Sequence, residues 1–280
     1  MSPLSPSPAR PCRRLPWYSG GAAEYLASAE ALLENVAATG RSALRWYVVD
    51  TPALLLGASQ KAASVDAEAC REAGVAVYQR AAGGLVVLAD GDMLGLDVAL
   101  PRDDPLLLPD LTASYRWLGE AWSAALRSIR LGAALVDVEG ARANACDESR
   151  ETRLARQVCF GGLSPYEVTV RDRKAVGLAQ VRRRYGALFQ AAVQARWVPA
   201  RLTTLLALSP DDRASLTRVL EARVTGLEEA AGRPIAFAAV IAAVESALTA
   251  QGLVPVDDVW TPEERAATTR LLAERYRPIL

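Results

Sequence analysis

Short runs of apolar and β-branched residues, most of them bounded by turn residues, are the feature that most constrains the fold. They predict strands at 44–49, 53–56, 75–79, 85–88, 94–100, 166–170, 175–180 and 187–193. Between them, helical spacing of apolar residues predicts helices at 22–38, 64–73 and 111–129. Strands interspersed with helices in this way are typical of an α/β or α+β chain, and 280 residues are enough to bury a sizeable core.

The last quarter of the sequence has a different character, because signals for the start of a helix replace the strand pattern. Ser209-Pro210 and Thr261-Pro262 each place a hydroxyl residue before a proline, with acidic residues in the following turn. A similar hydroxyl, that of Ser64, is expected to cap the helix at 64–73. We therefore expect a helical part after about residue 205.

Two segments give no periodic signal. Residues 1–16, MSPLSPSPARPCRRLP, are rich in proline and serine, which predicts a disordered N-terminal arm outside the fold. Residues 137–156 are polar and rich in alanine, and they are interpreted as a long excursion of the kind that often covers a binding site.

Composition excludes several classes of function. Lysine plus arginine equals aspartate plus glutamate at 32 each, so no overall field favours nucleic acid or an anionic membrane, and neither is expected as a partner. The absence of histidine excludes Ser-His-Asp and Cys-His catalysis and histidine-ligated metals. The most apolar run, 235–244, is about half as long as a bilayer-spanning helix, which predicts a cytoplasmic protein.

The four cysteines lie far apart in the sequence and form no CxxC pair. No zinc site or other metal site is therefore expected. The cysteines are expected to be reduced thiols in a reducing compartment. The cysteines are Cys12, Cys70, Cys146 and Cys159.

The first candidate site is a strand that runs into a glycine pair within residues 78–90. Gly83 and Gly84 allow a backbone to pass close to a ligand, and Arg80 is able to hold a carboxylate or phosphate beside them. A glycine pair between two strands also fits an ordinary tight turn, so this motif alone leaves both interpretations open.

The second candidate site combines a thiol and an ammonium. Cys159 precedes a glycine turn, and Lys174 begins the next strand of a hairpin whose turn is Arg171-Asp172-Arg173. A thiol accepts an acyl group as a thioester, and a nearby ammonium favours the thiolate and polarises the acyl carbonyl. Cysteine is also a common small core residue, and a lysine at a strand end is often only solvated, so these alternatives remain.

Three segments together carry a resemblance to a known family. They are TPALLLGASQ at 51–60, YQRAAGGLVVLADGDMLGLDV at 78–98 and CFGGLSPYEVTVRDRKAVGLAQVRRR at 159–184. Their order resembles the lipoate-protein ligases and their octanoyltransferase relatives. The resemblance implies a biotin/lipoate ligase-type catalytic domain at 17–205, with mixed, largely antiparallel sheets and packed helices, followed by a helical accessory region at 206–280.

The resemblance also implies a set of site residues. In the family an arginine and a glycine-rich strand lie along the acyl ligand, and a lysine in a K-x-x-G-x-A-Q segment contacts its carbonyl. Octanoyltransferases that work through a covalent step carry a nucleophilic cysteine shortly before that lysine. The matching residues are Cys159 and Lys174 as catalytic groups and Arg80, Gly83, Gly84, Gly177, Ala179 and Gln180 as substrate-binding groups.

Departures from the ligase pattern indicate which branch of the family is closer. Leu85 stands at the third glycine, and Gln190-Ala191 stands at a later His-Gly pair. The run R-x-x-G-G-L-x-V followed by Asp90 is more similar to the octanoyl amidotransferase branch, although Phe160 replaces a proline that tends to follow the cysteine there.

The leading hypothesis is transfer of an octanoyl or lipoyl group to a lysine of a lipoyl-domain protein through a thioester on Cys159. The donor is an acyl carrier protein or another lipoyl-domain protein. One alternative is an ATP- and magnesium-dependent lipoate-protein ligase that works through an acyl-adenylate. Another is a noncatalytic relative that binds an acyl group or a lipoyl domain without turnover.

Overall fold

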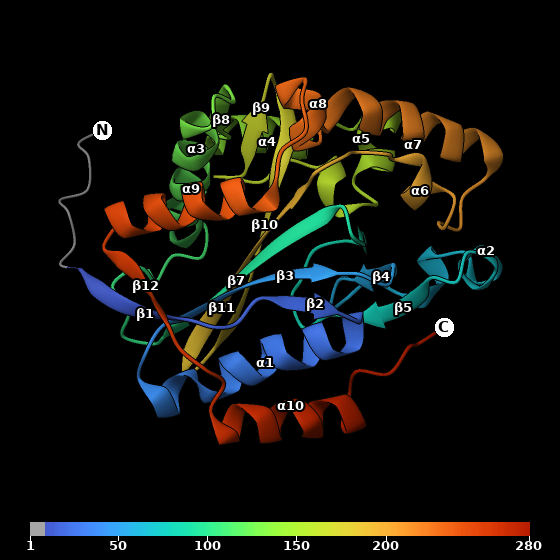
Figure 1. Ribbon diagram of the computed structural model, residues 1–280. Helices are drawn as coiled ribbons and strands as arrows, with labels where there is room; N and C mark the ends of the chain where they lie inside the picture. Colours follow the sequence, from blue (N-terminus) through green and yellow to red (C-terminus); the bar gives the residue numbers. More distant parts are fainter. Residues whose placement is uncertain (1–8) are drawn as a thin grey trace.

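The structure is a computed structural model that describes residues 9–280, and within that range the strands form two sheets (Figure 1). The larger sheet has the order β12-β1-β3-β7-β11-β10-β9-β8, with β2 also paired to β3. Its strands are β1 (Arg10–Arg14), β2 (Tyr18–Gly20), β3 (Ala43–Val49), β7 (Met93–Pro101), β8 (Ala133–Leu135), β9 (Val168–Val170), β10 (Arg173–Arg183), β11 (Gly186–Gln194) and β12 (Leu253–Asp257). The smaller sheet has the order β5-β4-β6 and consists of β4 (Ala53–Leu56), β5 (Ala76–Gln79) and β6 (Val87–Ala89).

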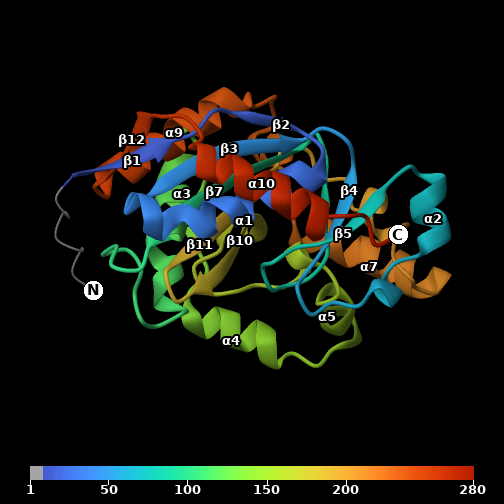
Figure 2. The ribbon, with the colours of Figure 1, turned by 90° about the horizontal axis from the view of Figure 1, so that it is seen from below.

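Helices cover both faces of the larger sheet. They are α1 (Ala22–Thr39), α2 (Ala67–Glu72), α3 (Arg116–Ser128), α4 (Val138–Cys146), α5 (Arg150–Ala155), α6 (Ala200–Thr203), α7 (Pro210–Arg223), α8 (Leu227–Ala231), α9 (Phe237–Ala250) and α10 (Pro262–Glu274). Helices α3 and α9 lie on one side and α1 on the other, with α10 packed against α1 (Figures 1 and 2). Among the described residues, no helix is both long enough and apolar enough to cross a membrane.

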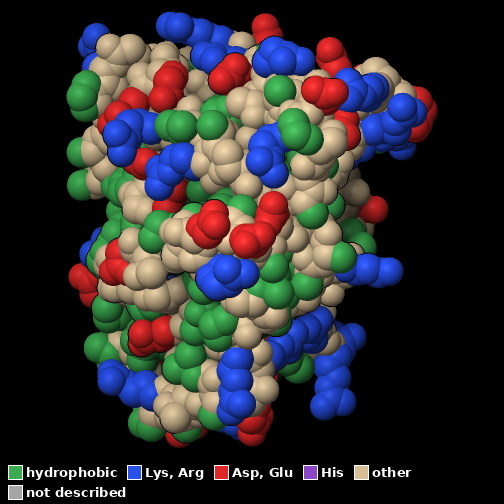
Figure 3. All heavy atoms as spheres, turned by 90° about the vertical axis from the view of Figure 1, so that its right-hand side faces the viewer, with side chains coloured by type: hydrophobic (Ala, Val, Ile, Leu, Met, Phe, Trp, Pro, Cys, Tyr) green, Lys and Arg blue, Asp and Glu red, His purple; other side chains and the backbone are tan. Residues whose placement is uncertain are grey.

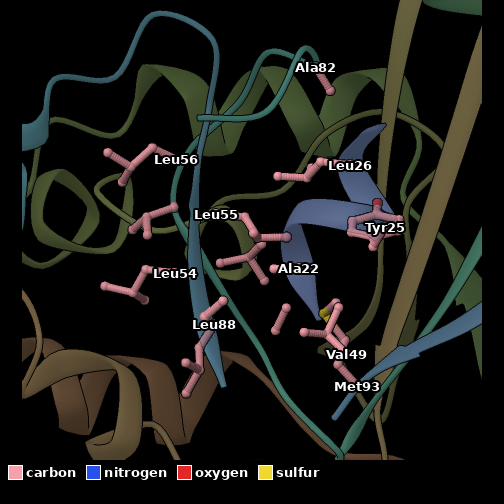
Figure 4. Close-up of a cluster of buried hydrophobic side chains, with 14 of the residues drawn as sticks. Ala22, Tyr25, Leu26, Val49, Leu54, Leu55, Leu56, Ala82, Leu88 and Met93 are labelled. Atoms are coloured by element: carbon pink, nitrogen blue, oxygen red, sulfur yellow. The ribbon is translucent and has the colours of Figure 1, made fainter. Parts of the chain in front are cut away.

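The two faces of β7 belong to two different cores. Leu94, Leu96 and Val98 belong to the core that contains α3 and α9, as the period-two alternation of a strand requires. Met93 and Ala99 belong to the other core, which lies between the larger sheet, α1 and the smaller sheet. Figure 4 shows part of this second core, where side chains of α1, β4 and β7 meet.

Most of the elements expected from the sequence are confirmed. The fold is mixed α/β with largely antiparallel strand pairs, and the helix expected at 22–38 is α1. Arg171 and Asp172 both have positive φ in the turn between β9 and β10, which is the conformation that a tight hairpin turn requires. Ser209 and Thr261 cap α7 and α10, as predicted.

The expected disordered arm at 1–16 is wrong for Arg10–Arg14, which form β1. This strand pairs in parallel with β12 and with β3, and Arg13 is buried in an ion pair with Glu264. Composition did not reveal the strand because its partner β12 lies near the other end of the sequence. Residues 1–8 of the arm lie outside the described residues.

The C-terminal part is not purely helical, because β12 extends the larger sheet. Helix α10 packs on α1, so this part contributes to the same core as the rest of the chain. The division of the chain near residue 205 stays a prediction.

Two further expectations are corrected. The excursion at 137–156 contains α4 and α5, whose first turns are capped by the side chains of Asp137 and Ser149. The cap of α2 is Asp66, which accepts hydrogen bonds from two backbone N–H groups, whereas the Ser64 hydroxyl donates to the carbonyl of Lys61. A carboxylate is an equally good cap, and it lies one position before the first helical residue.

The surface carries both signs of charge. On the face shown in Figure 3, Lys and Arg side chains lie among Asp and Glu side chains, in agreement with a formal net charge of zero.

Candidate active site

A cavity of ≈ 430 Å³, open solvent at its mouth included, lies between the two sheets. Strands β10 and β11 form its floor, and Leu55 and Val87, which pair across β4 and β6, form the opposite wall. The residues that line it are Tyr25, Tyr47, Leu55, Arg80, Val87, Met93, Cys159, Phe160, Gly177, Leu178, Ala179, Gln190, Ala191 and Ala192. Most of this lining is apolar, which suits an alkyl chain.

Cys159 reaches the cavity from the short 3₁₀ turn Cys159–Gly161. Its backbone N–H donates to the carbonyl of Val86 at 2.9 Å, which ties the turn to the smaller sheet. Gly161 is required there, because a Cβ at this position would lie 2.0 Å from the carbonyl oxygen of Ala155 in α5. The half-buried thiol is therefore held on the cavity wall by its neighbours on both sides.

Arg80 is the cation that lies beside the sulfur. Its Nη2 is 3.9 Å from Sγ of Cys159 and donates to the carbonyl of Leu85 at 3.0 Å. Its buried Nε has no hydrogen-bond partner among residues 9–280, so one N–H of the guanidinium is left unsatisfied. The structure thus brings together Arg80 and Cys159, which lie 79 positions apart in the sequence.

The glycine pair shapes the loop that follows Arg80. Gly84 has φ +92°, and its carbonyl oxygen lies where a Cβ on Gly57 would be, so the two backbones approach closely. Gly83 and Gly84 are exposed and are not among the residues that line the cavity. Their contact with an acyl ligand stays a prediction.

Lys174 is buried beneath the turn that carries Cys159. Its Nζ donates to the carbonyls of Cys159 and Gly162, both at 2.9 Å, and pairs with Oε2 of Glu167 at 2.7 Å. These three contacts use all three ammonium protons. A register shift between Lys174 and Val176 accompanies this orientation, as β-bulges often re-aim a side chain. Lys174 does not line the cavity, and its ammonium holds the Cys159 turn from below.

The remaining predicted residues of β10 divide between the two faces of the strand. Gly177 and Ala179 line the cavity. Gln180 points to the opposite face, as its parity requires, and its Nε2 donates to the carbonyl of Leu111 at 2.8 Å. Of the predicted substrate-binding residues, Arg80, Gly177 and Ala179 line the cavity. Gln180 lies outside it.

One end of the cavity is polar, which was not predicted from the sequence. Nε2 of Gln190 donates to the hydroxyl of Tyr25 and to Oδ1 of Asp97, both at 2.8 Å, and the Tyr25 hydroxyl donates to that of Tyr47 at 2.8 Å. Burial raises the pKa of both tyrosines, so both stay protonated at neutral pH. Asp97 also forms a fully buried ion pair with Arg45 at 2.8 Å.

A signal for this polar end does exist in the sequence. Asp97 interrupts an otherwise apolar strand, and a charge in such a place requires buried partners. Gln190 is recognisable from sequence only as a departure from the family pattern. Within residues 9–280, no cluster of three or more cysteine, aspartate or glutamate side chains is arranged to hold a metal ion.

Comparison with known proteins identifies the family. The sequence profile of the lipoyl protein ligase A/B catalytic domain matches residues 21–249. The chain belongs to this family. Among curated members it is similar to octanoyltransferase LipM of Kyrpidia tusciae, with 32% identity over 238 residues that cover 82% of this chain and 83% of that protein. It is 26% identical to octanoyltransferase LipM of an Exiguobacterium species over 258 residues, 91% of each chain.

Solved structures confirm the lipoyl protein ligase A/B fold. A bi-partite lipoate protein ligase from Thermoplasma acidophilum superposes with a TM-score of 0.75 at 20% identity, covering 95% of this chain and 92% of that one. A lipoate-protein ligase A bound with ATP superposes with a TM-score of 0.73 at 21% identity, covering 96% and 95%. At these identities the likeness establishes the architecture alone.

Proposed function

We propose that this chain transfers an octanoyl or lipoyl group to a lysine of a lipoyl-domain protein through a thioester on Cys159. The observation that carries the proposal is the position of the Cys159 thiol, on the wall of an apolar cavity and 3.9 Å from a guanidinium nitrogen of Arg80. Octanoyltransferase relatives that align with most of the chain support this reaction over an ATP-dependent ligation.

The first step loads the enzyme. The Cys159 thiolate attacks the carbonyl of the donor's acyl group, the bond from that carbonyl to the donor's sulfur or nitrogen breaks, and the leaving group takes up the thiol proton. The acyl chain then lies in the cavity as a thioester of Cys159. Arg80 supports this step because its guanidinium lies 3.9 Å from the sulfur, and its free Nε–H is able to donate to the carbonyl oxygen as negative charge develops there.

The second step unloads the enzyme. The neutral amine of the acceptor lysine attacks the thioester carbonyl, an amide bond forms, and the C–S bond breaks. The proton lost by the amine returns to the sulfur, so the free thiol is regenerated. No nucleotide is consumed, because a thioester donor already carries an activated acyl group, and with an amide donor the amide broken in the first step is balanced by the amide formed in the second. ATP and magnesium belong only to the ligase alternative.

The role of Lys174 follows from its hydrogen bonds. Because all three of its protons are used, contact with the acyl carbonyl requires exchange of one bond to the carbonyl of Cys159 or Gly162. While both of these hydrogen bonds are formed, Lys174 fixes the position of the turn that carries the thiol. We therefore assign it a positioning role before acylation and a polarising role during it.

The proposal includes the partners and the location of the reaction. The acceptor is a lipoyl-domain protein, and the donor is an acyl carrier protein or a second lipoyl-domain protein. We place the reaction in the cytoplasm, because a free thiol such as that of Cys159 persists in a reducing compartment.

Mass spectrometry tests the covalent step. The intact protein is incubated with octanoyl-loaded acyl carrier protein or octanoylated lipoyl domain, in the absence of ATP. We expect a mass increase of one octanoyl group on the wild-type protein and on Cys146→Ala, a control in which an exposed thiol is removed. Cys159→Ala is expected to show neither the adduct nor transfer to an unmodified lipoyl domain.

Two outcomes contradict the proposal. Transfer that requires ATP with free octanoate and survives Cys159→Ala would identify a ligase. Tight binding of octanoate with neither adduct nor product after prolonged incubation would identify a noncatalytic acyl-binding protein.

A further inference from the structure

The register of the larger sheet aligns a row of small residues across the cavity. Gly177 of β10 pairs with Ala192 of β11, Ala192 pairs with Gly95 of β7, and Gly95 pairs with Tyr47 of β3. The row therefore runs perpendicular to the strands, from the side of the cavity where Phe160 packs over Gly177 toward β3. Gly177 and Ala192 of this row line the cavity, and their small side chains leave room for an alkyl chain to approach the sheet between the rings of Phe160 and Tyr47.

The ring of Tyr47 closes this row. A Cβ on Gly95 would lie 2.0 Å from a carbon of the Tyr47 ring, so the ring lies flat over the backbone of β7 where only glycine leaves room for it. The ring of Tyr25 stacks on it, with centroids 3.9 Å apart and an angle of 23° between the ring planes. Tyr47 is thus held from both sides, and it is 3% exposed.

The length of the row matches a medium-length acyl chain. Neighbouring strands lie about 4.8 Å apart, so β7 lies roughly 9.5 Å from β10 across the sheet. With C–C bonds of about 1.5 Å, an extended chain of eight carbons spans about 9 Å. Cys159 lies in the same turn as Phe160, which packs over Gly177, so we take the thioester to lie at the β10 end of the row. A chain laid along the row from there ends against the Tyr47 ring.

The chemistry at this end opposes further extension. The hydroxyls of Tyr25 and Tyr47 and the amide of Gln190 are hydrogen-bonded to one another and to buried Asp97. A longer chain would have to displace the ring and bury its methyl end against these polar groups, which is unfavourable.

We propose that Tyr47, seated on Gly95 and stacked on Tyr25, is the end stop that limits the acyl group to about eight carbons. This inference rests on the proposed function and adds a specificity determinant to it. Tyr47 acts on chain length and takes no part in bond formation, so its removal changes which acyl group is accepted more than whether the thiol reacts.

Substitution of Tyr47 tests the end stop. The rate of acylation of Cys159 is measured by intact-protein mass spectrometry with acyl carrier protein loaded with chains of six, eight, ten and twelve carbons. We expect the wild-type rate to fall beyond eight carbons. In Tyr47→Ala, kcat/KM for the twelve-carbon chain relative to the eight-carbon chain is expected to rise by about tenfold or more.

Tyr47→Phe is the matched variant, because it keeps the ring and removes only the hydroxyl. Its profile is expected to keep the maximum at eight carbons. The same profile in wild type, Tyr47→Ala and Tyr47→Phe would overturn the end stop, as would a wild-type preference for twelve carbons.

A second substitution shows whether an altered profile comes from misfolding of Tyr47→Ala. A binding measurement tests the end stop separately from the acyl-transfer proposal. Ala192→Val narrows the middle of the row and is expected to weaken binding of eight-carbon chains about tenfold without altering alkylation of Cys159 by iodoacetamide. Calorimetric titration with free octanoate and dodecanoate measures the length limit without turnover. Preference for octanoate in wild type, lost in Tyr47→Ala, supports the end stop even if no thioester forms, whereas equal affinity of both acids for wild type contradicts it.

Discussion

Lys174 and Glu167 form a buried ion pair directly below the turn that carries Cys159. Glu167 also accepts hydrogen bonds from the backbone N–H groups of Ser164 and Leu178, so its carboxylate ties the 159–164 segment to β10. A buried charge that loses its partner is costly, whereas the loss of both charges together costs much less. Comparison of the single and double variants therefore separates the contribution of Lys174 to stability from its contribution to acyl transfer.

Lys174→Met is expected to lower the free energy of unfolding by about 3–5 kcal/mol, because it leaves Glu167 buried and unpaired. The double variant Lys174→Met/Glu167→Gln is expected to regain most of that stability in urea denaturation but not the rate of acyl transfer. Glu167→Gln alone serves as the control for the loss of the carboxylate. Wild-type transfer by the double variant would rule out any action of Lys174 on the acyl carbonyl.

The residues of the candidate site were predictable from sequence to different degrees. Cys159 and Arg80 lie in recognisable motifs, and the structure places them side by side at the cavity. Glu167 lies within the 159–184 segment but no local signal singled it out, and Tyr47 lies outside all three family segments. The importance of both depends on contacts with residues that are distant in the sequence or lie on another strand. The roles of all these residues stay predictions until the variants are measured.

At the level of secondary structure, strand alternation decides which side of the sheet each side chain faces, although Leu178 and Ala191, whose parity is opposite, also border the cavity. Gly177 and Ala179 lie on the cavity face of β10, and Gln180 lies on the other face. The family resemblance implied that all three residues bind substrate, but successive side chains of a strand point to opposite faces of the sheet. The helix starts at Ser209 and Thr261 were predictable because a cap is a local interaction within one turn.

The cap of α10 provides a test of stability. Thr261 and Glu264 form a reciprocal capping box at the start of this helix. Thr261→Ala is expected to lower the free energy of unfolding by about 1 kcal/mol, measured by chemical denaturation, and to speed hydrogen exchange at the start of α10. Thr269→Ala, at an exposed position inside the same helix, is the control, and an equal loss in both variants would contradict the role of the cap.

Across the whole molecule, strands from early and late in the sequence pair in the larger sheet. Strand β1 pairs with β12, and Arg13 joins Glu264 of α10 and Asp258 in buried and partly buried ion pairs. The Val259 N–H and the guanidinium groups of Arg13 and Arg41 lower the pKa of Asp258 from its ordinary value of 3.8. This carboxylate therefore links the stability of the contacts between β1 and the segment that follows β12 to pH.

The pKa of Asp258 is lower in the folded state than in the unfolded chain, so its ionised form stabilises the fold when the pH is above the ordinary pKa. This contribution disappears as the pH falls through the pKa of the folded state. Asp258→Asn is accordingly expected to melt at a lower temperature than wild type near pH 6. The difference is expected to shrink from about pH 4 downward. Asp103→Asn, at an exposed position outside the described ion pairs, is the control; a difference for Asp258→Asn that stays constant with pH would contradict the assignment.

Local pattern was sufficient for much of this protein: the α1 helix, the β9–β10 hairpin turn, the two capped helix starts and the motifs around Arg80 and Cys159 all depend on neighbours within a few positions. Long-range pairing settled the rest. The pairing of β1 with β12, the burial of Lys174 against Glu167 and the placement of Tyr47 over Gly95 each require chain segments to meet in a particular register. The physical reason is that a strand's partner and the face it buries are set by hydrogen bonding between distant segments, which no short window of residues contains.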